Sequence, residues 1–257
     1  MKNIFKGFIM ICFVSFIVGC GTDEAEVSGE ATAGDDVLKM ATSAEFPPFE
    51  SRDEEGNFEG FDIDLAHLIA EELGYDLEID DMKFDGLIGA LQADRVDMVL
   101  AGMSMTEERR ENVDFSQEYH RSGEMFLSLK DDPFENIENL DGKVVGVQLG
   151  TIQEEGAEKL QEEYDFDIQK LDDSNVLIQE LKSKRIDVAY MDTEVAVGYK
   201  NAQDLFAIKD PTSASPGMGI AFPKGSDLVD DVNDILDEFE EDGTMEELRD
   251  KWMTEEE

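Results

Sequence analysis

The hydrophobic pattern of the chain repeats itself once. Residues 87–104 (LIGALQADRVDMVLAGMS) and residues 177–194 (LIQELKSKRIDVAYMDTE) share Leu-Ile, Leu, Arg and Asp in register. Each copy predicts an amphipathic helix, a polar turn and a short apolar strand. The predicted strands, at residues 96–100 and 186–190, are apolar enough to lie inside a parallel sheet. The pattern therefore predicts a βαβ unit that is used twice.

Further elements surround both copies of the repeat. Strands are predicted at residues 37–41 and 143–147, and amphipathic helices at residues 60–75 and 151–164. Two short helices, separated at Gly243, are predicted near the C-terminus. Strands and helices that alternate in this way predict two α/β lobes. Because ligands of open α/β sheets bind beyond the carboxyl ends of the strands, the segments after the strands are expected to face a shared cleft.

The N-terminal residues have the features of an export signal. Two lysines precede an apolar stretch at residues 8–18, which is shorter than the roughly 20 residues that span a bilayer. Cys20 follows Ile-Val-Gly, and this resembles the lipobox of bacterial lipoproteins, in which the cysteine is lipidated and becomes the mature N-terminus. An ordinary cleaved signal with an incidental cysteine is the alternative. Cys12 would leave with the signal, so no disulfide is expected in the mature chain.

The charge of the chain limits its partners. The sequence holds 64 acidic and 21 basic side chains, which gives a formal net charge of −43. Such a surface repels polyanions, so nucleic-acid binding is excluded, and so is direct adsorption to an anionic membrane. Self-repulsion of this size destabilises a compact state unless salt screens it. We therefore expect a protein with a halophilic acidic surface that works outside the cell in high salt.

Six separated stretches follow one another in the order of a known family. They are ATSAEFPPFE, GFDIDLAHLIAEELG, FDGLIGALQADRVDMVLAGMSMTEERRENVDFSQEYHRSGE, LDGKVVGVQLGT, MGIAFPKGSDL and EEDGTMEELRDKWM. Together they resemble the polar amino-acid-binding proteins of ABC importers (family 3), glutamine-binding proteins above all, from about residue 37 to residue 253. The resemblance implies a two-lobed α/β fold of the periplasmic-binding-protein type (type II), with a parallel-dominated sheet in each lobe and a hinge between them.

The expected organisation of the chain follows from the signal, the repeat and the resemblance. The chain is expected to cross between the lobes near residues 122–123 and 211–218. The expected parts are a lipoprotein signal peptide (1–19), a flexible acidic tether (20–36), the first part of lobe 1 (37–123), lobe 2 (124–215), and the return to lobe 1 with the C-terminal helices (216–257).

Arg109 and Asp192 are the leading candidates for ligand binding. Arg109 is the third residue after the helix start at Thr106, where a capping box would have Glu or Gln. A guanidinium beside a helix N-terminus forms a site that binds an anion. The alternative is that Arg109 is a surface arginine that pairs with a nearby acidic side chain. The resemblance implies that Arg109 binds the α-carboxylate of the ligand, assisted by Ser104 and the backbone of Gly102. It implies that Asp192 binds the α-ammonium group, and Asp192 also fits a helix N-cap.

The resemblance assigns the rest of the site to aromatic and polar side chains. Phe46 and Phe84 match rings that sandwich the ligand, and Thr151 belongs to a second-lobe loop that touches the ligand on closure. Ser43 and Gln148 stand where glutamine-specific members have Asp and Lys, so the side-chain specificity is left open.

Three neighbouring residues are assigned less directly. Phe49 and Phe61 are expected in the hydrophobic core. Glu45 is expected either to reach a basic ligand side chain, which would favour Arg, Lys or His, or to lie on a solvated rim.

These assignments predict an extracytoplasmic lipoprotein, held at the outer face of the membrane by its lipid anchor. It would capture a polar amino acid by hinge closure and deliver it to an ABC permease. A monomer is expected, with no cofactor, no metal and no catalytic residue. The alternatives are a dehydratase on the same fold, which would need a poised acid or base, a binder of a compatible solute, a sensory domain and a structural lipoprotein. Neither His67 nor His120 is expected in the cleft.

Overall fold

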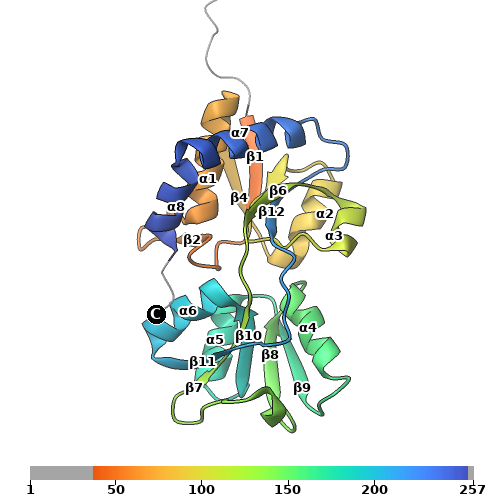
Figure 1. Ribbon diagram of the computed structural model, residues 1–257, viewed down its shortest axis with the longest axis vertical. Helices are drawn as coiled ribbons and strands as arrows, with labels where there is room; N and C mark the ends of the chain where they lie inside the picture. The colour runs from red at the N-terminus through yellow and green to blue at the C-terminus, as the bar shows by residue number, and fades with distance from the viewer. Residues whose placement is uncertain (1–36, 254–257) are drawn as a thin grey trace, which may run out of the picture. The chain divides into compact units, whose positions relative to one another are not determined.

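The computed structural model describes residues 37–253, which form two five-stranded sheets and a small two-stranded one (Figure 1). The first sheet contains, in spatial order, β4 (Asp76–Asp81), β1 (Val37–Thr42), β5 (Met98–Val99), β12 (Met218–Phe222) and β6 (Asp114–His120). The second contains β11 (Leu205–Lys209), β7 (Glu124–Leu129), β10 (Val188–Asp192), β8 (Val144–Gln148) and β9 (Asp167–Leu171). The small sheet pairs β2 (Ser51–Arg52) with β3 (Phe58–Glu59).

The two large sheets have the same pattern of strand directions. In the first, β4, β1 and β5 are parallel, and β12 runs antiparallel between β5 and β6. In the second, β9, β8 and β10 are parallel, and β7 runs antiparallel between β10 and β11. This arrangement confirms the predicted fold class of two α/β lobes.

Helices flank both sheets (Figure 1). Those that pack around the first sheet are α1 (Phe61–Leu73), α2 (Leu87–Gln92), α3 (Glu107–Asn112), α7 (Leu228–Asp242) and α8 (Thr244–Trp252). Those that pack on the second are α4 (Ile152–Leu160), α5 (Ser174–Lys182) and α6 (Thr193–Gln203). Two 3₁₀ turns, η1 (Phe84–Gly86) and η2 (Ile137–Asn139), lie in the connections. The predicted break between the last two helices is confirmed at Gly243, which has a φ of 91°.

The sequence repeat corresponds to α2–β5 in the first lobe and α5–β10 in the second. After each helix the chain turns through a residue with positive φ, Asp94 at 51° and Lys184 at 58°. The first predicted strand is shorter than expected, because only Met98 and Val99 pair with a neighbour. The second lies two residues further along than expected, because β10 reaches Asp192. Both repeats then enter a helix, capped by Thr106 and Asp192 respectively.

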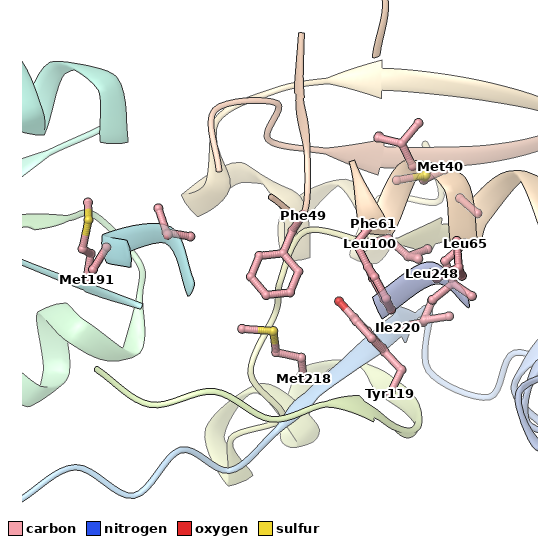
Figure 2. Close-up of a cluster of buried hydrophobic side chains, with 14 of the residues drawn as sticks. Met40, Phe49, Phe61, Leu65, Leu100, Tyr119, Met191, Met218, Ile220 and Leu248 are labelled. Atoms are coloured by element: carbon pink, nitrogen blue, oxygen red, sulfur yellow. The ribbon is translucent and has the colours of Figure 1, made fainter. Parts of the chain in front are cut away.

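Buried apolar side chains fill the space between sheets and helices. Figure 2 shows one such cluster, in which Phe49, Phe61 and Tyr119 lie among methionine, leucine and isoleucine side chains. Phe49 and Phe61 are fully buried, as predicted for core residues. Their rings meet edge to face, with centroids 6.5 Å apart.

Two connections join the lobes, at residues 121–123 between β6 and β7 and at residues 210–217 between β11 and β12. Both lie at the places predicted for the chain crossings, except that Met218 already belongs to β12. The predicted lobe limits after residues 123 and 215 fall in these connections and stay predictions. The signal peptide, the tether and Cys20 lie outside the described residues. Within residues 37–253, no helix combines the length and apolar character that crossing a bilayer requires.

Candidate functional site

A cavity of about 370 Å³ lies where residues that follow strands of both sheets meet. All nine predicted ligand-binding residues line it: Ser43, Phe46, Phe84, Gly102, Ser104, Arg109, Gln148, Thr151 and Asp192. Four further lining residues were not among those predicted: Glu50, Ile152, Gln153 and Met218. The volume is within the range of about 300–1,000 Å³ that is typical of small-molecule pockets.

Arg109 brings a buried positive charge to this cavity. Its backbone N–H donates to the Oγ1 of the N-cap residue Thr106 at 3.2 Å, which fixes the first turn of α3. The guanidinium donates to the carbonyl oxygens of Ser104 at 2.8 Å and Gly150 at 2.9 Å. Its hydrogen bonds to described residues thus go to carbonyls and not to a carboxylate. Burial lowers the pKa of Arg109 to about 10, so the group stays charged at neutral pH and attracts an anion.

The loop after β5 is held in shape by a glycine. Gly102 has a φ of 54°, and a Cβ at this position would lie 3.0 Å from the ring of Phe46. Its N–H donates to Asp62 Oδ2 at 2.8 Å. That donor is therefore occupied, and the predicted help of the Gly102 backbone is limited to the shape of the loop. Phe84 is the other aromatic residue predicted to contact the ligand. The centroid of its ring lies 5.3 Å from the guanidinium carbon of Arg109.

Asp192 brings a carboxyl group to the cavity from the second lobe. It ends β10 and caps α6, and its Oδ1 accepts hydrogen bonds from the Glu194 N–H at 2.8 Å and the Ser122 hydroxyl at 3.0 Å. The N-cap reading and the predicted cavity position are both correct. Burial raises the pKa of Asp192 to about 7, because the charged form loses its hydration.

The loop between β8 and α4 supplies the other second-lobe residues. Thr151 caps α4, and its hydroxyl donates to the Gln148 carbonyl oxygen at 2.7 Å. Gly150 lies in the turn between Gln148 and Thr151 and has a φ of 78°. Its carbonyl oxygen accepts a hydrogen bond from Arg109. Gln148 points its amide toward the first lobe, where Nε2 donates to Glu45 Oε1 at 2.9 Å.

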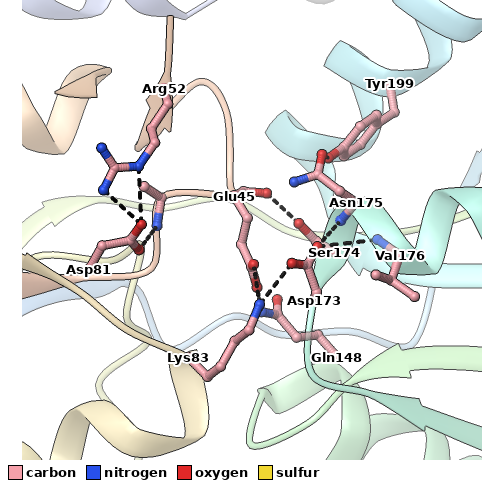
Figure 3. A network of polar contacts seen from close by, with 11 residues as sticks. Glu45, Arg52, Asp81, Lys83, Gln148, Asp173, Ser174, Asn175, Val176 and Tyr199 are labelled. Carbon is pink, nitrogen blue, oxygen red and sulfur yellow. Dashed lines mark hydrogen bonds and ion pairs between the residues drawn. The ribbon is translucent and has the colours of Figure 1, made fainter. Parts of the chain in front are cut away.

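A polar network crosses between the lobes beside the cavity (Figure 3). Lys83 Nζ binds Glu45 Oε2 at 3.0 Å and Asp173 Oδ2 at 2.7 Å. The Ser174 hydroxyl and the Gln148 amide also donate to Glu45. We call these five residues the interlobe network. Glu45 is buried, so it does not lie on a solvated rim, and it is not among the residues that line the cavity. Its predicted contact with a basic ligand side chain stays a prediction.

Glu50 is the main residue that sequence reasoning missed. It is fully buried and lines the cavity, and neither carboxylate oxygen has a hydrogen-bond donor among the described residues. The only signal in the sequence was its place at the end of the motif ATSAEFPPFE, directly after a core phenylalanine.

Neither histidine of the described residues, His67 or His120, lines the cavity. Burial lowers the pKa of His120 to about 4, which keeps it neutral at pH 7. Within residues 37–253, no group of three or more His, Cys, Asp or Glu side chains is arranged to hold a metal ion.

Comparison with known proteins identifies the family. The sequence model of the bacterial extracellular solute-binding proteins, family 3, matches residues 38–255. The chain belongs to this family. This family 3 protein is 41% identical to the arginine-binding extracellular protein ArtP of Bacillus subtilis (strain 168), over 99% of both chains. It is 32% identical to a probable histidine-binding protein of Campylobacter jejuni, over 99% of this chain and 100% of the relative.

Solved structures place the fold of this family 3 protein among binding proteins as well. It superposes on an ancestral arginine-binding protein bound to arginine with a TM-score of 0.81 at 40% identity. The match covers 86% of this chain and 99% of the other. The relatives are binding proteins by name, which agrees with a site that holds opposite charges in one enclosed space.

Proposed function

We propose that the protein captures a polar amino acid between its lobes and delivers it to an ABC permease. One observation carries this proposal: Arg109 from the first lobe and Asp192 from the second line the same cavity, and both are buried. An amino acid carries the complementary charges at a fixed spacing. Its α-carboxylate pairs with Arg109 and its α-ammonium with Asp192, in charge-assisted hydrogen bonds that are stronger than neutral ones.

The remaining cavity residues suit the rest of such a ligand. The rings of Phe46 and Phe84 provide apolar faces, while Ser43, Gln148 and Thr151 provide polar contacts. A micromolar dissociation constant corresponds to a binding free energy of about −8 kcal/mol. Two charge-assisted contacts and an aromatic sandwich supply that amount after the ordering costs of closure.

The two connections between the lobes support capture by hinge closure. Each joins the sheets through a few residues, which absorb a change of backbone angles more easily than paired strands do. The hydrogen bond of Arg109 to Gly150 and the interlobe network tie the two lobes together. Opening would break these contacts and release the ligand to the permease.

Calorimetry with a panel of amino acids tests the binding role. The relatives' names make arginine and histidine the first ligands to try. Binding of at least one polar amino acid is expected, and its loss in Asp192→Ala would assign the ammonium contact. If no amino acid bound and an uncharged compatible solute did, the charge-pair argument would be wrong. Turnover assays on cyclic amino-acid precursors address the dehydratase alternative separately.

We also propose that the mature chain is a monomer, anchored outside the cell membrane through lipidated Cys20. The cysteine follows a short apolar stretch and a glycine, as in lipoprotein signals. The anchor would keep the binding protein near its permease. Expression of Cys20→Ala in a bacterial host tests this, because the variant should appear in the medium while the natural chain stays with the membrane fraction.

A further inference from the structure

One fully buried carboxylate of the first lobe is hydrogen-bonded to the loop after β5. It belongs to Asp62, the second residue of α1, whose side chain has no exposed surface. An acidic side chain in the first turn of a helix usually stabilises the helix from its surface. Asp64 is such a residue, because it is partly exposed and pairs with Lys251 at 2.6 Å. Desolvation makes a buried acid costly, so the burial of Asp62 needs a different explanation.

The hydrogen bonds of Asp62 supply that explanation. Its Oδ2 accepts from the Gly102 N–H at 2.8 Å and from the Tyr119 hydroxyl at 2.9 Å. Its backbone N–H donates to the Phe49 carbonyl oxygen at 2.9 Å, which fixes the start of α1 against the segment that follows β1. Asp62 therefore joins three separate parts of the first lobe: the segment after β1, the loop after β5, and strand β6.

Tyr119 fixes the orientation of this carboxylate. Its ring is stacked on that of Phe61, with centroids 5.9 Å apart, in the core of the first lobe (Figure 2). Because Tyr119 is only 3% exposed, its hydroxyl needs a buried acceptor, and Asp62 provides it. Oδ1 of Asp62 has no donor among the described residues, so a single oxygen accepts both hydrogen bonds.

The loop that begins at Gly102 leads to Arg109. The guanidinium of Arg109 donates to the Ser104 carbonyl oxygen at 2.8 Å, two residues after the N–H that Asp62 accepts. The other end of the loop is also held, because the Met105 N–H donates at 2.9 Å to a carbonyl oxygen of the segment before β12. With both ends fixed, the Ser104 carbonyl has a defined place, from which it orients the guanidinium.

We propose that Asp62 is a positioning residue for amino-acid binding: its carboxylate fixes the loop after Gly102 in the shape that aims Arg109 at the ligand carboxylate. This inference rests on the proposed function, in which Arg109 binds that carboxylate. Asp62 is not among the residues that line the cavity, so it acts through the loop. Loss of its carboxylate leaves two buried donors without an acceptor and allows the loop other shapes.

Two substitutions of Asp62 test the need for an acceptor. Asp62→Asn keeps one oxygen that accepts both hydrogen bonds, so ligand affinity should stay within about threefold of the natural value. Asp62→Leu has a similar size and no acceptor, so affinity should fall at least about tenfold. Calorimetry measures both with the amino acid of the panel that binds the natural chain most tightly, arginine being tried first. An equally large loss in both variants would contradict the role of the acceptor.

Ile63→Ala is the control for a simple loss of stability. Ile63 is the neighbouring residue of α1 and is buried in the core of the first lobe. Its truncation leaves a cavity and does not affect the hydrogen bonds of the loop, so the melting temperature should fall while ligand affinity stays unchanged. All titrations are run at a temperature at which circular dichroism shows each variant folded. Equal losses of affinity in Ile63→Ala and Asp62→Leu would refute a positioning role.

Tyr119→Phe keeps the inference testable if Asp62→Leu does not fold. This substitution removes only the hydroxyl that orients the carboxylate and leaves the stacked ring in place. Ligand affinity should fall about two- to fivefold, because Asp62 keeps its bond to the loop and loses its fixed orientation. Natural affinity in Tyr119→Phe would contradict the proposal.

A double-mutant cycle shows whether Asp62 acts through Arg109. Arg109→Lys loses the planar fork that the loop orients, so Asp62→Leu should weaken binding less in that background than in the natural chain. A merely structural role of Asp62 gives losses that add. Additive losses would therefore overturn the proposal.

The failure of this inference differs from the failure of the proposed function. If the natural chain binds an amino acid and Asp62→Leu binds it equally well, amino-acid capture stands and the positioning role is wrong. If the natural chain binds no amino acid at all, the proposed function is wrong, and this inference fails with it.

Discussion

The Arg109 guanidinium of the first lobe donates a hydrogen bond to the Gly150 carbonyl oxygen of the second, at 2.9 Å. The same guanidinium donates to Ser104 of its own lobe at 2.8 Å. A single planar cation therefore holds the binding loops of both lobes around one cavity. The side chain that is expected to bind an anion is therefore also the one that connects the two lobes.

Arg109→Lys is expected to weaken amino-acid binding by roughly 10- to 100-fold. Lysine keeps the charge and loses the planar fork that contacts carbonyls and a carboxylate together. Arg109→Ala should lose more, because the ligand carboxylate then has no buried cation. Calorimetry measures both variants. Arg110→Ala is the matched control, since this neighbour on the same short helix does not line the cavity. Natural affinity in Arg109→Ala would refute the site.

Asp192→Asn is expected to change how stability depends on pH. Burial raises the folded-state pKa of Asp192 from 3.8 to about 7. An acid of this kind stabilises the fold below its unfolded pKa, and that contribution is lost as pH rises through the folded pKa. Asparagine keeps the N-cap and cannot ionise.

The melting temperature shows this difference in the ligand-free protein. Relative to the natural chain, the Asp192→Asn melting temperature should rise between pH 4 and pH 7 by on the order of 5 °C. The Glu241→Gln substitution removes the same charge from an exposed position. Its melting temperature relative to the natural chain should not change between pH 4 and pH 7. A constant difference across this range would mean that Asp192 is not held in a desolvated environment.

Lys83→Met is expected to lower ligand affinity about two- to fivefold without unfolding either lobe. Lys83 contributes two of the contacts of the interlobe network, and its side chain is 48% exposed, so each ion pair is worth little. Losing them disfavours the closed form, in which the ligand is bound. The loss should shrink at high salt, because salt already screens these pairs.

Lys224→Met offers a matched comparison for this network. Lys224 pairs with Asp114 at 2.7 Å within the first lobe, and its side chain is 51% exposed. Its loss removes an ion pair of similar exposure without affecting closure. Equal effects of the two substitutions on ligand affinity would exclude a specific role for Lys83 in closing the lobes.

The mature protein is expected to be more stable in 2 M NaCl than in 0.1 M NaCl. The chain has 64 acidic against 21 basic side chains, so most surface acids have no cation to pair with. Added salt reduces the Debye length from about 10 Å at 0.1 M to about 3 Å at 1 M and screens their repulsion. Thermal melts at both concentrations measure the effect. A melting temperature that fell with salt would contradict a high-salt habitat.

The sequence alone determined the parts of this protein that local pattern encodes. The spacing and number of apolar residues predicted the repeated helix–strand units. Residue types typical of helix starts placed Thr106 and Asp192 at the N-caps of α3 and α6, where the structure has them. Because the carboxyl ends of parallel strands lie at one edge of a sheet, the same pattern predicted that these segments share a cleft. Motif resemblance added the aromatic residues, and all nine predicted residues line the cavity.

Only the tertiary structure decided contacts between residues far apart in the chain. Met218 reaches the cavity because β12 returns from the second lobe and inserts between β5 and β6. Glu45 binds Lys83 and Gln148 instead of lining the cavity, whereas Glu50 lines it without a hydrogen-bond donor among the described residues. Two acids of one short segment thus have different environments, because a cation and a donor from distant segments pack against Glu45 and not against Glu50. A local pattern contains no information about such partners, because desolvation and pairing arise only when separate segments pack together.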